Sequence, residues 1–119
     1  MARILLAEDD DNLRRFLVRG LSRAGHTVLS AGDGEAAFAL LLDAPVDLLV
    51  ADVVMPGLDG IELARRASAR WPNLRVMFIT GFAAVAMRHR DVSRPAATVV
   101  AKPFHLRDLV GEVERILEA

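Results

Sequence analysis

What the sequence lacks already narrows the choice of function. Its 119 residues include no cysteine, which excludes disulfides and thiolate metal sites and suits a cytosolic protein. Neither charge is in excess: 15 basic and 16 acidic residues leave a net charge of -1, whereas a dedicated nucleic-acid-binding domain is normally basic. No apolar stretch approaches the roughly 18 residues that a membrane-spanning helix needs. The sequence therefore predicts no nucleic-acid partner and no membrane insertion.

Targeting segments and linkers are also missing. Met1-Ala2-Arg3 leads directly into an apolar run, leaving no room for a signal peptide, so we expect a cytoplasmic protein. We find no internal repeat, low-complexity tract or linker, and no DNA-binding, cyclase or esterase module. Apolar residues make up 53% of the chain, which excludes a disordered protein, and the length fits one domain, residues 1–119.

Short apolar runs alternate with segments of helical periodicity. The runs are typical of buried strands and lie at residues 4–7, 27–31, 46–51, 75–79 and 98–101. Helices are expected at residues 13–24, 34–41, 61–67, 82–87 and 106–117, with a loop at 88–97. This alternation predicts an α/β fold: a flavodoxin-like (βα)5 doubly wound parallel sheet of five strands, in the order 2-1-3-4-5.

Several positions near the first and last helices carry more specific expectations. Asp10 or Asp11 can cap the first helix, and Gly25 can end it. The apolar stripe of that helix includes Phe16. His26 and His89, which have no recognisable partner or phosphohistidine setting in the sequence, are expected near the surface. His105 is expected to be a partly exposed residue at the start of the last helix.

Polar side chains follow four of the apolar runs. Glu8 and Asp9 follow the first run, Asp52 the third, Thr80 the fourth and Lys102 the fifth. Because the carboxyl ends of parallel strands meet at one edge of a sheet, we expect these side chains to converge there. Carboxylate oxygens suit Mg²⁺, and a lysine with a hydroxyl suits a phosphoryl group. The sequence therefore predicts a magnesium-dependent phosphoryl site.

Asp52 is the best candidate nucleophile, because it ends the most apolar run. Attack of its carboxylate on phosphorus would give an aspartyl phosphate. Taken alone, each residue has a simpler explanation: Glu8 and Asp9 could cap a helix, and Asp52 could be a turn aspartate. The combination favours a site, since three carboxylates gathered at one edge repel one another unless a cation offsets them.

These residues resemble a bacterial two-component response-regulator receiver domain over essentially the whole chain. The motifs that carry the resemblance are Glu8-Asp9, the stretch from Asp52 to Gly60, Thr80-Gly81, and Lys102-Pro103-Phe104. The resemblance implies that Asp52 accepts phosphate from a histidine kinase or a histidine phosphotransferase in a phosphorelay. Such a protein is not an enzyme with an external substrate, although it can dephosphorylate itself.

The same resemblance implies how each residue acts. Asp9 and Asp52 would bind Mg²⁺ directly, Glu8 would act mainly through metal-bound water, and the backbone carbonyl of Val54 would complete the protein ligands. The phosphoryl group would be bound by Thr80 and Lys102, and the Lys102-Pro103 peptide would be cis.

One departure from the receiver pattern is informative. Receivers usually carry an aromatic switch residue three positions before the lysine, where this chain has Val99. Either another side chain then reports phosphorylation, or the signal moves through the backbone of residues 80–87. The output face expected from this includes residues 80–87, 99–101 and the last helix, with Phe82 and Met87 as candidate apolar contacts and a basic rim of Arg88, Arg90 and Arg94.

A narrower resemblance accounts for Val99. Residues 1–11, 76–86 and 102–110 look like the CpdR group of single-domain receivers, which has valine at that position. The group receives phosphate from a hybrid histidine kinase through a phosphotransferase. Unphosphorylated members help the ClpXP protease find cell-cycle substrates and localise to the cell pole.

Two alternatives stay open at this point. The chain could be a stand-alone phosphate shuttle or sink that drains a kinase. A more remote alternative is a haloacid-dehalogenase-like phosphohydrolase, which also uses an aspartate nucleophile and magnesium. That family needs the nucleophile after the first strand with a second aspartate two residues later, whereas the best acceptor here, Asp52, follows the third run.

Overall fold

The computed structural model describes residues 2–81 and 98–118. Its five strands are parallel and hydrogen-bonded in the order β2-β1-β3-β4-β5, which confirms the predicted flavodoxin-like sheet. The strands are β1 (Arg3–Ala7), β2 (Thr27–Ala31), β3 (Leu48–Asp52), β4 (Arg75–Thr80) and β5 (Thr98–Ala101). The helices are α1 (Asp11–Arg23), α2 (Gly34–Asp43), α3 (Gly60–Arg70) and α5 (Leu106–Glu118). The helix expected at 82–87 and the loop at 88–97 lie outside the described residues.

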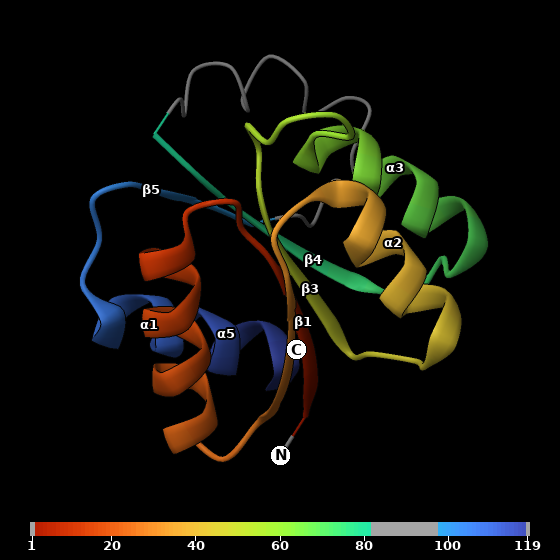
Figure 1. Ribbon diagram of the computed structural model, residues 1–119. Coiled ribbons are helices and arrows are strands. Elements are labelled where there is room, and N and C mark those ends of the chain that lie inside the picture. Colours follow the sequence, from red (N-terminus) through yellow and green to blue (C-terminus); the bar gives the residue numbers. More distant parts are fainter. Residues whose placement is uncertain (1, 82–97, 119) are drawn as a thin grey trace.

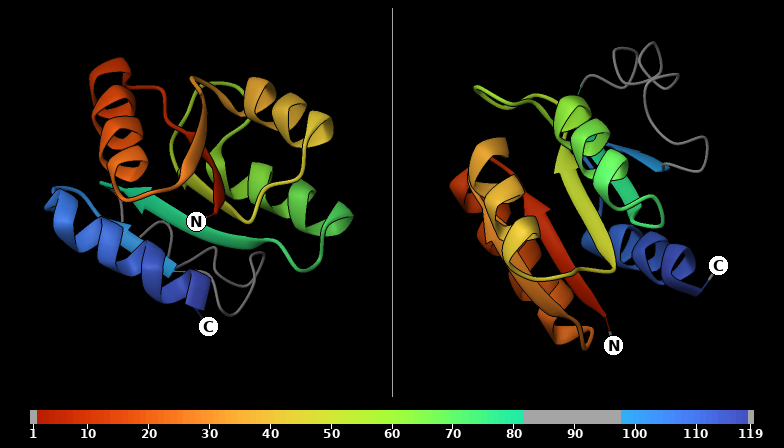
Figure 2. Two further views of the ribbon diagram at one scale, coloured as in Figure 1. Left: turned by 90° about the horizontal axis from the view of Figure 1, so that it is seen from below. Right: turned by 90° about the vertical axis from the view of Figure 1, so that its right-hand side faces the viewer.

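Helices cover both faces of the sheet. Helices α1 and α5 lie on one face, and α2 and α3 lie on the other (Figures 1 and 2). Alternate residues of each strand supply the two cores: Leu6 and Val50 pack toward α1 and α5, whereas Leu5 and Leu49 pack toward α2 and α3. Burial on both faces explains why the strands read as continuous apolar runs. Every residue of β3 is buried, so this central strand carries its last residue, Asp52, into the interior.

Aspartates begin three helices at the carboxyl edge of the sheet. The side chains of Asp10, Asp33 and Asp59 accept hydrogen bonds from backbone N–H groups in the first turns of α1, α2 and α3. Of the two cap candidates for α1, Asp10 is therefore the one used. Gly25 follows the other end of α1 with a φ of 101°, as expected for a glycine that ends a helix.

Three sequence expectations were wrong. β3 begins at Leu48 rather than at residue 46, since Asp47 instead exchanges hydrogen bonds with the Arg3 backbone through its N–H and its carboxylate.

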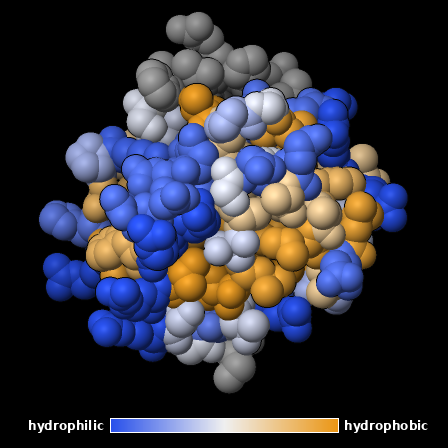
Figure 3. Space-filling view, in the orientation of Figure 1, coloured by the Kyte–Doolittle hydropathy of each residue, from blue (hydrophilic) through white to orange (hydrophobic). Residues whose placement is uncertain are grey.

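The second wrong expectation concerns Phe16, which is 49% exposed, because α1 buries Leu17 and Leu21 and turns residue 16 away from the core. In Figure 3 the surface over α1 is largely hydrophilic, and hydrophobic surface lies between α1 and α2.

The third wrong expectation concerns His26, which is buried rather than at the surface. Its Nδ1 accepts a hydrogen bond from Ala2 N at 3.3 Å, and its Nε2 lies 2.6 Å from Glu114 Oε2. The partner stands 88 positions away along the chain, so no local pattern could indicate it. His105 is exposed just before α5, as expected, and His89 lies outside the described residues.

Helix α3 begins directly against the end of β3. A Cβ atom on Gly60 would overlap the carbonyl oxygen of Asp52, so only glycine allows this approach. The N–H of Gly60 also donates to the carbonyl of Val53 at 3.0 Å. The start of α3 thereby fixes the backbone that carries Asp52. No helix within residues 2–81 and 98–118 has both the length and the apolar character needed to cross a bilayer.

Candidate metal and phosphoryl site

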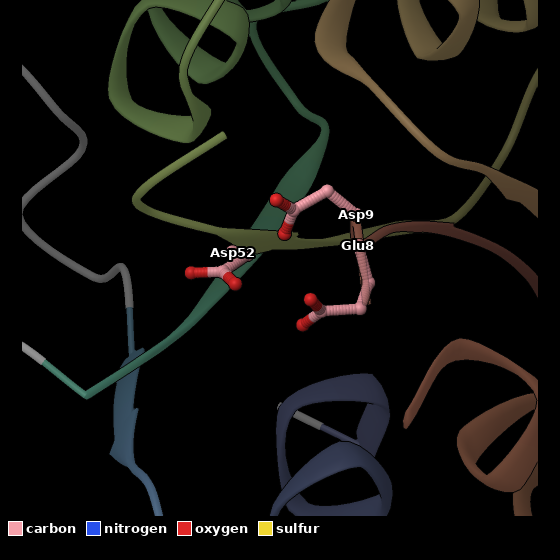
Figure 4. Close-up of side chains that lie close together, drawn as sticks. All are labelled: Glu8, Asp9 and Asp52. Atoms are coloured by element: carbon pink, nitrogen blue, oxygen red, sulfur yellow. The ribbon is translucent and has the colours of Figure 1, made fainter. Parts of the chain in front are cut away.

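The structure brings Glu8, Asp9 and Asp52 together at the carboxyl edge of the sheet. One carboxylate oxygen of each lies within 4.8 Å of the other two, and both N-terminal carboxylates turn toward Asp52 (Figure 4). This follows from the strand order, since β1 and β3 are neighbours and Ala7 is in register with Ala51. Glu8 and Asp52 are buried, whereas Asp9 is exposed to solvent.

Lys102, which follows β5, reaches two of these carboxylates. Its Nζ lies 2.8 Å from Asp52 Oδ2 and 3.3 Å from Glu8 Oε1. Its backbone N–H donates to the carbonyl of Thr80 at 2.8 Å, which ties the end of β5 to the end of β4. The Lys102-Pro103 peptide is cis, as the receiver resemblance implied.

Thr80 and Val54 lie at the same edge of the sheet, at the end of β4 and just after β3. Thr80 is fully buried and ends β4, between the strands that lead to Asp52 and Lys102. Val54 lies in the loop after β3, where its N–H donates to Asp52 Oδ1 at 3.1 Å. The structure therefore places all six residues predicted from the sequence at one edge of the sheet.

Burial makes the charge of Glu8 costly. Its Oε2 accepts a hydrogen bond from Asp10 N at 3.0 Å, whereas its buried Oε1 has no hydrogen-bond partner among the described residues. Burial raises the pKa of Glu8 to about 7; the Asp10 N–H opposes this rise, and the Asp52 carboxylate adds to it. For Lys102, burial lowers the pKa, but the hydrogen bond and charge of Asp52, helped by Glu8, outweigh burial and raise it above its usual value.

This donor set fits a small divalent cation. Three carboxylates supply hard oxygen ligands, and the buried Glu8 Oε1 accepts no hydrogen bond from the described residues and has only the Lys102 ammonium, at 3.3 Å, beside it. A cation between the carboxylates would bind that oxygen and reduce the repulsion between the three negative charges. Among the described residues, Lys102 is the one cationic side chain that forms an ion pair with this group. The residues present therefore suit Mg²⁺, whose usual protein site is one or two carboxylates with phosphate oxygens and water.

Comparison with known proteins gives the family. Residues 4–114 match the response regulator receiver domain. The chain belongs to this family. It is 54% identical over 119 residues to the response regulator receiver protein CpdR of Brucella abortus (strain 2308), covering 100% of this chain and 99% of that protein. Receiver domains are signalling modules of two-component systems and bind Mg²⁺ at an acidic pocket of this kind.

Two further relatives extend the comparison. The chain is 35% identical to part of the sensor kinase CckA of Brucella abortus (strain 2308), covering 98% of this chain and 13% of the kinase. Its fold matches the response regulator TrrA from Thermotoga maritima, solved in complex with Mg²⁺ and BeF, with a TM-score of 0.87, 25% identity and coverage of 98% and 99%. Family membership leaves the haloacid-dehalogenase-like alternative without support.

The sequence did not indicate the groups that hold the acidic pair in place. The backbone N–H of Asp10 binds the Glu8 carboxylate, and Arg14 Nη1 donates to the Glu8 carbonyl at 2.8 Å. The spacing of Asp11 and Arg14, three residues apart on a helix, is compatible with their ion pair at 2.6 Å. Nothing in that spacing shows that the same arginine also reaches back to β1.

Proposed function

We propose that this chain is a phosphorylation-controlled switch of a phosphorelay, with Asp52 as the phosphoacceptor. One oxygen of its carboxylate attacks the phosphorus of a phosphohistidine on a histidine kinase or phosphotransferase. The O–P bond forms as the P–N bond breaks, and the imidazole leaves. The observation that carries this proposal is the position of Asp52: it is buried, ends the central strand, and lies between an acidic pair and a lysine.

We assign the metal to Asp9, Asp52 and the backbone carbonyl of Val54, with Glu8 acting mainly through water. When bound, Mg²⁺ would supply positive charge to the phosphoryl oxygens. Lys102 would bind one of these oxygens as a point cation, after giving up its contact with the Asp52 carboxylate, and Thr80 would donate a hydrogen bond to another. These roles follow the receiver pattern and are supported by the convergence of the side chains.

The chemistry is tested by phosphotransfer from candidate phosphodonors, followed by acid-lability measurement and site mapping. We expect the wild type to take up an acid-labile phosphoryl group at Asp52 in the presence of Mg²⁺, and Asp52→Asn to take up none while keeping the fold. Unchanged labelling of Asp52→Asn would overturn the assignment of the acceptor. Turnover of a generic phosphate ester would instead indicate an enzyme with an external substrate.

We further propose that the output is a CpdR-like contact with ClpXP, made by the unphosphorylated form to deliver cell-cycle substrates. The support is similarity over the full length to a CpdR protein, together with Val99 at the position of the usual aromatic switch. Val99 packs against the core covered by α2 and α3, and it has no ring with which to make an aromatic swing. We expect a cytoplasmic protein that is found at the cell pole.

Pull-down with ClpX tests the output separately from the chemistry. The wild type, Asp52→Ala and protein treated with Mg²⁺ and beryllium fluoride, a phosphoryl mimic, should be compared. We expect ClpX to retain the first two and to release the third. Equal retention of all three forms would remove the switching claim. Rapid phosphotransfer without any stable ClpX complex would favour the phosphate shuttle or sink.

A further inference from the structure

The peptide group between Glu8 and Asp9 determines where two of the three carboxylates point. The two side chains leave the backbone on either side of this peptide and both turn toward Asp52 (Figure 4). Glu8 has a second restraint, since its Oε2 accepts from Asp10 N, but Asp9 is exposed to solvent. The direction of Asp9 therefore depends strongly on how that peptide is held.

Arg14 holds the carbonyl of this peptide. Its Nη1 donates to the Glu8 carbonyl oxygen at 2.8 Å, while its Nη2 donates to Asp11 Oδ1 at 2.6 Å. The arginine side chain is only 19% exposed. Because the guanidinium is planar and rigid, one nitrogen held by Asp11 directs the other at the Glu8 carbonyl.

The surrounding backbone is shaped to admit the guanidinium. A Cβ atom on Gly32, in the connection between β2 and α2, would lie 3.2 Å from Arg14 Nη1. On the other side, the N–H of Glu8 donates to the carbonyl of Ala31 at 3.0 Å. Both backbone polar groups of Glu8 are thus bound, one by β2 and one by Arg14.

We propose that Arg14 is a positioning residue for the metal site: its guanidinium fixes the Glu8–Asp9 peptide and thereby aims the two carboxylates at the cation. This inference rests on the magnesium site of the proposed function. Among the described residues Arg14 donates to the Glu8 carbonyl and to Asp11 Oδ1, and not to the carboxylates of Glu8, Asp9 or Asp52, so we expect it to act on metal affinity through the position of the peptide. Outer-shell groups of this kind change metal affinity by about 10- to 100-fold when they are removed.

Calorimetric titration of the metal-free protein with MgCl₂ tests the inference. We expect Arg14→Ala to bind Mg²⁺ roughly 10-fold more weakly than the wild type. Arg14→Lys keeps the positive charge but has one nitrogen in place of the two that bind Asp11 and Glu8. We therefore expect its Mg²⁺ affinity to lie between those of the wild type and Arg14→Ala. The matched control is Arg15→Ala, since Arg15 is exposed on the same helix and donates to Asn12 Oδ1 at 2.9 Å; we expect wild-type affinity.

Two further measurements distinguish the proposed positioning role of Arg14 from a purely structural role. Urea unfolding with a chelator shows how much of each variant is folded under the conditions of the titration. Labelling with a small phosphodonor over a range of Mg²⁺ should show a raised half-saturating concentration for Arg14→Ala with the wild-type maximum. Gly32→Ala leaves Arg14 in the chain but crowds its guanidinium, and we expect a smaller loss in the same direction.

The outcomes distinguish this inference from the proposed function. A wild type that takes up no Mg²⁺ would overturn the metal site and the inference with it. Mg²⁺ uptake by the wild type with equal affinity in Arg14→Ala and Arg14→Lys would overturn the role of Arg14 alone. An equal loss in Arg15→Ala would also overturn it, since the effect would then come from helix charge and not from the bond to Glu8.

Discussion

Lys102 Nζ lies 2.8 Å from Asp52 Oδ2, although β4 separates the strands that lead to the two residues. The lysine side chain therefore spans the end of β4, and it also lies 3.3 Å from Glu8 Oε1. The ammonium group is the nearest cation to both buried carboxylates among the described residues. A metal ion and Lys102 consequently compete for the same negative charge.

Removal of this lysine charge should tighten metal binding. Lys102→Met leaves the acidic pair and Asp52 without their cation, so the attraction for Mg²⁺ increases. We expect a gain on the order of 1 kcal/mol, or about fivefold in affinity, by calorimetric titration. Lys102→Arg, which retains the charge, is the control and should change the affinity less. An affinity of Lys102→Met equal to or below that of the wild type would contradict this competition.

Glu8 should make the metal-free protein less stable as the pH rises. Its pKa is raised by burial from 4.5 to about 7, so the folded protein binds more protons than the unfolded chain between these values. The stability contributed by protonated Glu8 is fully present below pH 4.5 and is lost as the pH rises through about 7. Ionised Glu8 then lowers the free energy of unfolding by roughly 3 kcal/mol.

Glu8→Gln tests this relationship by urea unfolding with a chelator. The variant should be close to the wild type at pH 5 and more stable at pH 8, because the amide carries no charge to be buried. With saturating Mg²⁺ at pH 8 the wild type should instead be the more stable of the two proteins, since metal binding stabilises it more than it stabilises Glu8→Gln. Parallel pH profiles of the two metal-free proteins would show that Glu8 ionises without this penalty.

The bond between His26 and Glu114 should contribute to global stability. The buried ring joins the start of β2 to α5 and accepts from Ala2 N, so His26→Ala leaves a small cavity and an unpaired backbone donor. We expect a loss of about 1–2 kcal/mol in the free energy of unfolding. A double-mutant cycle with Glu114→Ala measures the pair, and exposed His105→Ala is the control. Additive effects in the cycle would mean that the bond contributes little.

Gly60 and Gly111 should respond in opposite directions to the same substitution. Gly60→Ala would drive a Cβ atom into the Asp52 carbonyl, so the start of α3 must move and stability should fall by at least about 3 kcal/mol. Gly111 lies in α5, where an added Cβ would meet no atom within 4 Å, and Gly111→Ala should stabilise by about 0.5–1 kcal/mol. Chemical denaturation measures both. A mild effect at Gly60 would show that α3 can shift freely against β3.

Much of the fold could be predicted because its signals are local. Continuous apolar runs such as Leu48–Ala51 mark strands buried on both faces, and an aspartate before a helical stripe, as at Asp10 and Asp33, marks a helix start. Where two neighbouring residues could fill the same role, the local pattern did not indicate which of them does so. Both Asp10 and Asp11 can cap α1, and Phe16 differs from buried Leu17 by one step around the helix.

The site could be predicted in outline for a similar reason. Parallel strands put their carboxyl ends at one edge, so Glu8, Asp52 and Lys102 had to emerge together once the strands were recognised. Strand order alone could not give the contacts. Side-chain directions, which apolar periodicity does not encode, decide these contacts. They include the ion pairs of Lys102 with Asp52 and Glu8 and the hydrogen bond from Arg14 to the Glu8 carbonyl.

By itself, then, the sequence determined which residues form strands and helices and which polar groups share an edge, because hydrophobic period, helix caps and chain direction are properties of neighbouring residues. The tertiary structure decided which distant groups touch. Such contacts are those of His26 with Glu114, of Gly60 with the Asp52 carbonyl, and of Lys102 with Asp52 across the end of β4. Each contact requires two elements to be packed at a fixed separation, and the packing of the whole core sets that separation.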